Sequence, residues 1–254
     1  MTSPVMGIRT FALVLLLGTV GSTVRGATLT SAESRCQLVL GPQTDLLGAR
    51  QATCLARCDR KAHAGKVPAT NCLSPSAGAT AACIATAEEG ARRRIGEACA
   101  ADCPECYAGA DCATFASGAI GATGVVVQGL AADIFCDGAG TGSPANVRCR
   151  GAAAQALAKV ATATGRCIVA CTTRERRGTL VAGTCIADPI VEPRTAGCFK
   201  AVARRTAPLL DRGCSDPATC LGPTLPQLVA RVQRQIVTDY RSFILCGSPS
   251  GSFL

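Results

Sequence analysis

Large aromatic side chains are scarce in this chain of 254 residues, which has no Trp, two Tyr and six Phe. Aromatic residues bury the largest apolar area per side chain, so their scarcity excludes a core built mainly on rings. Much of the apolar content is alanine, which removes little area from water per residue. We therefore expect a thin core that depends on covalent cross-links.

Histidine is also scarce, since His63 is the one histidine in the chain. Ser-His or Cys-His catalysis would have to use it, yet its surroundings, DRKAHAGK, are typical of a solvated helix end. The chain has no H-E-x-x-H, no phosphate-binding loop and no G-x-S-x-G. We therefore expect no enzyme activity, no cofactor and no resident metal.

The first 26 residues have the order of a secretory signal peptide, with Arg9 before the apolar run 11–17 and small residues through Val24. The apolar run is shorter than the roughly 20 residues of a membrane-spanning helix. We predict export to the periplasm, the cell surface or the extracellular space, with no transmembrane span after removal of residues 1–26. All 18 cysteines follow this segment, and an even number in an oxidising compartment predicts disulfides.

The spacing of the cysteines is duplicated. Intervals of 18, 4 and 14 residues separate the cysteines from Cys36 to Cys72 and again from Cys149 to Cys185, at an offset of 113. An interval of 16 residues then recurs in both halves, after a two-residue insertion. We predict a first repeat over 27–138, a Gly- and Ser-containing linker over 139–146 and a second repeat over 147–254.

Each repeat keeps eight framework cysteines, and equivalent cysteines should form equivalent bonds in both copies. The framework consists of Cys36, Cys54, Cys58, Cys72, Cys83, Cys99, Cys112, Cys136, Cys149, Cys167, Cys171, Cys185, Cys198, Cys214, Cys220 and Cys246. The remaining pair, Cys103 and Cys106, lies in a seven-residue addition to the first copy. A local disulfide between these two is the simplest prediction, with a reactive C-x-x-C or a zinc site as alternatives.

Hydrophobic periodicity predicts an all-α fold of three helices in each repeat. The interval of 18 is five helical turns, so Cys149, Cys167 and Cys171 should share one face of a helix. We expect the matching helix of the first copy to begin near Thr44, because Gly41 and Pro42 precede it. Second helices are expected over 80–100 and 195–212, and Pro208 could kink the latter.

The third helix of the second copy is predicted from a capping box, Thr224 with Gln227, and from one apolar face. That face contains Leu225, Val229, Val232, Ile236, Tyr240 and Phe243. Its counterpart, from Cys112 to Ala132, is uncharged and Gly-rich, and we expect a buried helix rather than a membrane span.

The duplicated motifs CLARC with GKVPATNC, and CIVAC with GTLVAGTC, resemble cysteine-rich repeats in exported proteins of environmental bacteria. The resemblance covers nearly the whole mature chain and brings no assigned activity with it. Plant lipid-transfer and inhibitor proteins also place eight cysteines on helices, but their C-C and C-x-C signatures are absent here.

The two halves differ in charge, with net −2 over 27–140 and net +9 over 141–254. The candidates for anion binding are Arg174, Arg176, Arg177, Arg231, Arg234 and Arg241. An anionic glycan, an envelope polymer or an acidic protein would fit them, whereas nucleic acid would not, because stacking aromatics are lacking. Alternatively, these arginines only keep an alanine-rich surface soluble.

Two functions therefore remain open from the sequence. The first is a non-catalytic, exported, disulfide-rich binding or structural protein, engaging an anionic surface through its second repeat. The alternative is a thiol-disulfide redox protein that acts through Cys103 and Cys106.

Overall fold

The fold is all-α, as predicted, and its helices form two layers. The computed structural model describes residues 29–73, 75–104, 107, 111–135, 138–181, 183–187, 190–214, 221 and 225–245. The helices are α1 (Ser31–His63), α2 (Thr70–Leu73), α3 (Gly78–Cys99), α4 (Cys112–Ile134), α5 (Pro144–Arg176), α6 (Pro193–Gly213) and α7 (Leu225–Asp239). A 3₁₀ turn, η2 (Thr184–Ile186), and a π-helical turn, η3 (Tyr240–Ile244), complete the described elements.

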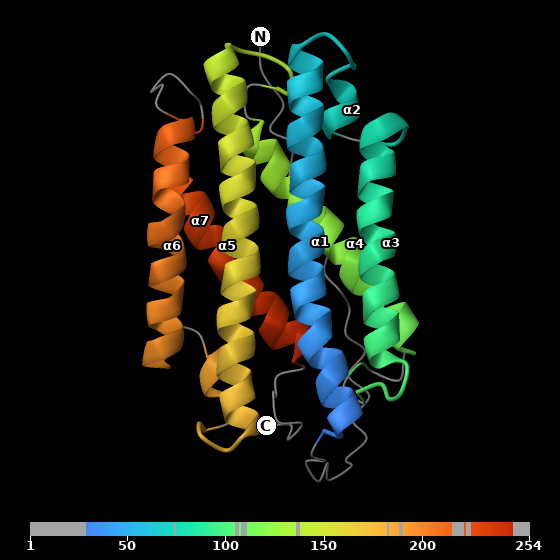
Figure 1. Ribbon diagram of the computed structural model, residues 1–254, viewed down its shortest axis with the longest axis vertical. Helices are drawn as coiled ribbons and strands as arrows, with labels where there is room; N and C mark the ends of the chain where they lie inside the picture. Colours follow the sequence, from blue (N-terminus) through green and yellow to red (C-terminus); the bar gives the residue numbers. More distant parts are fainter. Residues whose placement is uncertain are drawn as a thin grey trace, which may run out of the picture.

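The long helices α1 and α5 lie at the centre and run in opposite directions (Figure 1). In the same layer, α3 packs on the outer side of α1 and α6 on the outer side of α5. Helices α4 and α7 cross obliquely behind this layer, and both pack against α5. The arrangement brings residues from both halves of the sequence into one hydrophobic core, which includes Leu40, Val160 and Tyr240.

Disulfides link each central helix to its outer helix and to one short element, α1 to α3 and α2, and α5 to α6 and η2. In the first half they join Cys36 to Cys99, Cys54 to Cys83 and Cys58 to Cys72. In the second half they join Cys149 to Cys214, Cys167 to Cys198 and Cys171 to Cys185. Equivalent cysteines are therefore paired in both halves, and the predicted recurrence is confirmed for these three bonds. Cys106, Cys136, Cys220 and Cys246 lie outside the described residues.

The predicted local bond between Cys103 and Cys106 is wrong, because Cys103 is bonded to Cys112. Helix α4 begins at Cys112, after its side-chain cap Asp111, and this start brings the Cys112 sulfur to Cys103. The bond therefore closes a loop onto the first turn of α4 instead of closing the C-x-x-C on itself.

Helix α1 begins 13 residues earlier than the expected start at Thr44 and runs through Pro42. A capping box between Thr30 and Glu33 defines its first turn. A proline inside a helix costs about 3 kcal/mol, because a hydrogen bond is lost and the ring clashes with the preceding turn. Burial of Cys36 and Leu40 in that turn, and the Cys36–Cys99 bond, favour the helix and offset this cost.

The predicted linker is docked on the fold. The backbone N–H of Gly140 donates to Asp59 Oδ1 at 2.7 Å, and the buried Arg150 bonds both oxygens of the same carboxylate. Helix α5 begins at Pro144 behind the cap Ser143, so residues 144–146 are helical, contrary to their assignment to the linker. The predicted signal peptide, residues 1–26, lies outside the described residues.

Helix α4 is long and apolar enough to cross a membrane by length and composition, and 22% of its most apolar stretch is buried. A core helix of a soluble protein can have the same length and apolar composition. The expectation of a buried helix therefore holds on one face, where Ala116, Ile120, Val127 and Ala131 pack inward. The other face, which includes Val125, is exposed.

Four of the six residues predicted for the inner face of α7 are buried, namely Val229, Val232, Ile236 and Tyr240. Phe243 is instead 53% exposed, and Ile244 is buried in its place. The π-helical turn η3 explains the difference, because its wider turn places residue 244 rather than 243 below Tyr240. The side chain of Leu225 and the predicted cap Thr224 lie outside the described part of the chain.

The close approach of Tyr240 to Gly41 gives a test of this packing. A Cβ at Gly41 would lie 2.5 Å from the Tyr240 ring, whereas a Cβ at Gly96, on exposed α3 surface, would meet no atom within 4 Å. We expect Gly41→Ala to lower the free energy of unfolding by about 1–3 kcal/mol through overpacking. The control Gly96→Ala should raise it by about 0.5–1 kcal/mol through helix propensity. Guanidinium unfolding with intact disulfides measures the free energy of unfolding of both variants. An equal increase in this free energy for the two would contradict the packing of Tyr240 on α1.

Candidate functional site

A cavity of about 830 Å³ lies between the central helices α1 and α5 and the oblique helices α4 and α7. Its walls are mainly apolar, and all four helices contribute to them. The larger apolar side chains include Leu55, Leu130, Phe135, Leu157, Val232 and Ile236. Small-molecule sites typically enclose about 300–1,000 Å³ with such walls and a few polar groups.

Small residues on the central helices explain why the space is not filled. Gly48 and Ala52 of α1, and Ala154 and Ala161 of α5, line the cavity. Their side chains project little or not at all, so the helices behind them cannot close the gap by interdigitation. The alanine-rich composition that makes the core thin thus also provides the cavity.

Asp45 marks the buried end of the cavity, with 6% of the residue exposed. The Tyr240 hydroxyl donates to its Oδ2 at 2.9 Å. Gly165 of α5 makes room for this pair, because a Cβ there would overlap the same oxygen. Burial raises the pKa of Asp45 well above its usual range, although the bond from Tyr240 acts in the opposite direction.

A second carboxyl, Asp239, lines the same cavity from α7. Gln235 Nε2 donates to its Oδ1 at 2.8 Å, and burial raises the pKa of Asp239. The charge of Asp239 further raises the pKa of Asp45, so the two acids interact. The ionisable groups at this end of the cavity are therefore acidic, beside the neutral Thr44 and Gln235.

An ion pair between Arg231 of α7 and Asp133 of α4 marks the exposed end of the cavity. Their side chains are 48% and 42% exposed. Exposed ion pairs contribute only about 0–1 kcal/mol, so this pair bridges the two helices without locking them together. Arg231 had been predicted as an anion-binding residue, but its guanidinium bonds Asp133.

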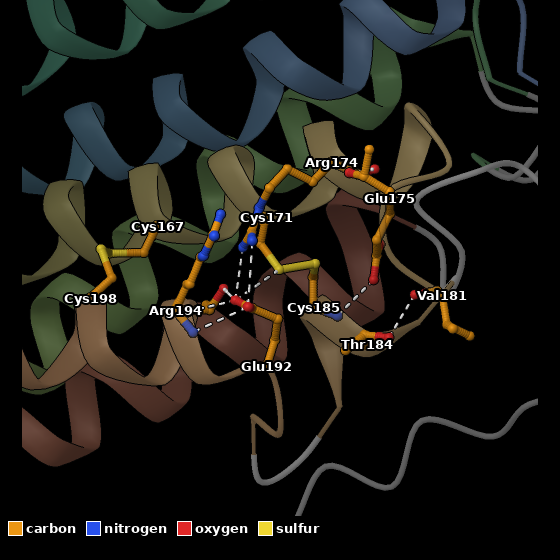
Figure 2. A network of polar contacts seen from close by, with 12 residues as sticks. Cys167, Cys171, Arg174, Glu175, Val181, Thr184, Cys185, Glu192, Arg194 and Cys198 are labelled. Atoms are coloured by element: carbon orange, nitrogen blue, oxygen red, sulfur yellow. Dashed lines mark hydrogen bonds and ion pairs between the residues drawn. A yellow bond between two sulfur atoms is a disulfide. The ribbon is translucent and has the colours of Figure 1, made fainter.

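Arg174 is also bonded within the chain. Figure 2 shows Glu192 between Arg174 of α5 and the first turn of α6, where Thr195 donates to it. Arg174 Nη2 lies 2.8 Å from Glu192 Oε2. Burial opposes ionisation, but hydrogen bonds from Arg174 and Thr195 lower the pKa of Glu192 to about 2. This network caps α6 beside the Cys171–Cys185 bond, so its role is structural.

The six candidate arginines therefore do not act as one set. Arg176 donates to the Ser34 carbonyl and to Gln37 Oε1, which ties the end of α5 to the start of α1. Arg177, Arg234 and Arg241 are exposed. Half of the predicted anion-binding residues thus hold helices of this chain together.

Three sulfurs, those of Cys36, Cys99 and Cys112, lie within 4.8 Å of one another, a spacing that could hold a metal ion. All three are bonded in disulfides, Cys36 to Cys99 and Cys112 to Cys103. A disulfide offers no thiolate, so this cluster cannot bind zinc in its oxidised form.

Sequence reasoning missed Asp45 and the hydroxyl of Tyr240 as a polar pair of the site, although it placed Tyr240 on an apolar face. The duplication could have revealed them, because the offset of 113 places Ala158 opposite Asp45. Counting six residues back from the closing cysteines likewise places Leu130 opposite Tyr240. The shared framework needs neither polar group, so the pair is an addition to one side of the fold.

The buried acid gives a pH-dependent test. The folded state holds the Asp45 proton more tightly than the unfolded chain, so this group stabilises most below about pH 4 and less as pH rises through the folded pKa. Each tenfold change in proton affinity corresponds to about 1.4 kcal/mol. Asp45→Asn should therefore reduce the fall in unfolding free energy between pH 4 and pH 8. Part of this pH dependence should remain in the variant, because the pKa values of Asp239 and Glu175 are also raised. Identical pH profiles for the two proteins in guanidinium unfolding would contradict the burial of an uncompensated acid.

No family model, no curated protein and no solved structure matches this chain. The residues of the site form an apolar cavity with acidic groups at the buried end and an exposed ion pair at the other.

Proposed function

We propose that the protein is an exported, non-catalytic binding protein that holds a small, largely apolar molecule in the cavity between α1, α4, α5 and α7. The observation that carries the proposal is the cavity itself, whose volume of about 830 Å³ and apolar walls suit such a ligand. Disulfides tie α3 to α1 and α6 to α5, and the buried Arg150–Asp59 ion pair joins α5 to α1, so the wall formed by α1 and α5 is preorganised.

Binding is favoured over catalysis by the groups available. The described residues that line the cavity include the acids Asp45, Asp133 and Asp239, but no serine, cysteine, lysine or histidine. The hydroxyls of the two lining threonines, Thr44 and Thr123, donate to backbone carbonyls of their own helices and not to a base. The nucleophile–base pairs of covalent catalysis are therefore not assembled there. Export is supported by the disulfide-rich fold, because such bonds persist in oxidising compartments.

The redox alternative loses its basis, because Cys103 is paired with Cys112 rather than with Cys106. An anionic partner would have to be bound through Arg177, Arg234 and Arg241, the exposed members of the predicted set. Screening by salt would weaken such contacts, whereas apolar binding in the cavity would not depend on salt in this way. We therefore place the principal ligand in the cavity.

Two glycines of α4 provide a matched test. A Cβ at either Gly129 or Gly118 would meet no atom within 4 Å, but Gly129 lines the cavity and Gly118 does not. We expect Gly129→Leu to weaken binding of the neutral apolar dye N-phenyl-1-naphthylamine about tenfold, or by about 1.4 kcal/mol, because the new side chain occupies the site. Gly118→Leu should leave it unchanged. Fluorescence titration measures both, and equal effects, or no dye binding by the parent protein, would contradict the proposal.

A further inference from the structure

The two oxygens of Asp45 are in different situations. Oδ2 accepts the hydrogen bond from Tyr240, whereas Oδ1 accepts no hydrogen bond from the described residues. Asp45 is only 6% exposed, and it lines the cavity. Oδ1 is not one of the fully buried side-chain atoms that lack a partner among the described residues, so it is open to the space of the cavity. A hydrogen-bond donor on a ligand in the cavity can therefore reach Oδ1.

The buried end also lacks a counter-ion among the described residues. The one basic residue that lines the cavity, Arg231, bonds Asp133 at the exposed end. From α7, Asp239 and Tyr240 face the same region, and the lining residues of α5 are the uncharged Ala154, Leu157 and Ala161. The charged groups near Asp45 therefore add negative charge and do not neutralise it.

We infer that the molecule held in this cavity is an apolar amine, whose ammonium group binds the carboxylate of Asp45 at the buried end while its apolar part lies along the walls. The inference rests on the binding function proposed above. An ammonium group supplies both the hydrogen-bond donor that Oδ1 lacks and the missing positive charge. An alcohol would supply only the donor, and a carboxylate ligand would be repelled by Asp45 and Asp239 wherever these acids are ionised.

The proton balance of binding follows from the burial of Asp45. The amine enters as its ammonium form, Asp45 releases its proton to the solvent, and the complex contains one carboxylate and one ammonium group. Affinity for the amine should therefore rise with pH until Asp45 is ionised in the free protein. A neutral ligand of the same chain length should show no such dependence.

Three probes with the same alkyl chain test the inference on the disulfide-bonded protein. Decylamine, decanol and decanoate, each below its micelle concentration, compete with N-phenyl-1-naphthylamine for the cavity. We expect decylamine to bind at least about tenfold more tightly than the other two. Asp45→Asn should abolish this preference while the dye still binds, which shows an intact cavity. Asp239→Asn should reduce the preference, and Glu97→Gln, which changes an exposed carboxylate outside the cavity, should not.

The outcomes separate the two proposals. Dye binding with equal affinity for decylamine and decanol would overturn the amine inference and leave the binding function standing. Preference for decanoate, lost in Arg231→Gln, would overturn it by placing the head group at the exposed end. Absence of dye binding would overturn the binding function itself.

Discussion

The fold depends on covalent attachment of its outer helices to an antiparallel pair, α1 and α5. Alanine contributes little burial per residue, so packing alone would hold these helices weakly. The described disulfides tie α3 to α1 and α6 to α5, whereas none of those between described residues reaches α7. Each half of the front layer is thus cross-linked, and the buried Arg150–Asp59 ion pair joins the two halves. Among the described residues, α7 and the turn η3 that follows it are held by apolar packing, the Tyr240–Asp45 bond, a hydrogen bond from Gln233 to the Phe199 carbonyl and an exposed ion pair. The cavity therefore lies between a cross-linked layer and the two helices, α4 and α7, that cross it obliquely.

Duplication supplies the framework of this fold, and divergence supplies its site. Three disulfides occupy equivalent positions in both halves, which makes the covalent skeleton nearly symmetric. The polar groups break this symmetry, because Asp45 faces Tyr240 where the other copy has Ala158 and Leu130. An acid buried without a basic partner opposes stability, so the shared framework gives no reason for it. The position of Asp45 in the cavity does give a reason for an acid there.

Cysteine spacing and helical periodicity predicted the all-α fold and the equivalent bonds because both are local or repeated properties. The start of α1 was not predictable in this way, since burial of Leu40 and a distant disulfide outweigh the local cost of Pro42. The exposure of Phe243 follows from a π-helical turn, which a fixed period of 3.6 cannot represent. The site was missed because Asp45 and Tyr240 are 195 residues apart and meet only through packing of α7 on α1.

The net charge of +9 gives no indication of the field inside the cavity. Arg174, Arg176 and Arg231 bond groups of the chain itself, and exposed charges act over only about 8 Å at physiological ionic strength. The cavity itself is lined by Asp45 and Asp239, whereas its one basic lining residue, Arg231, is paired with Asp133, so the acids set the local potential at the end where Asp45 lies. A basic protein can therefore select a cation, provided that the selecting carboxyls are buried and the arginines are engaged elsewhere. The basic surface would then slow the approach of the cation without preventing its binding.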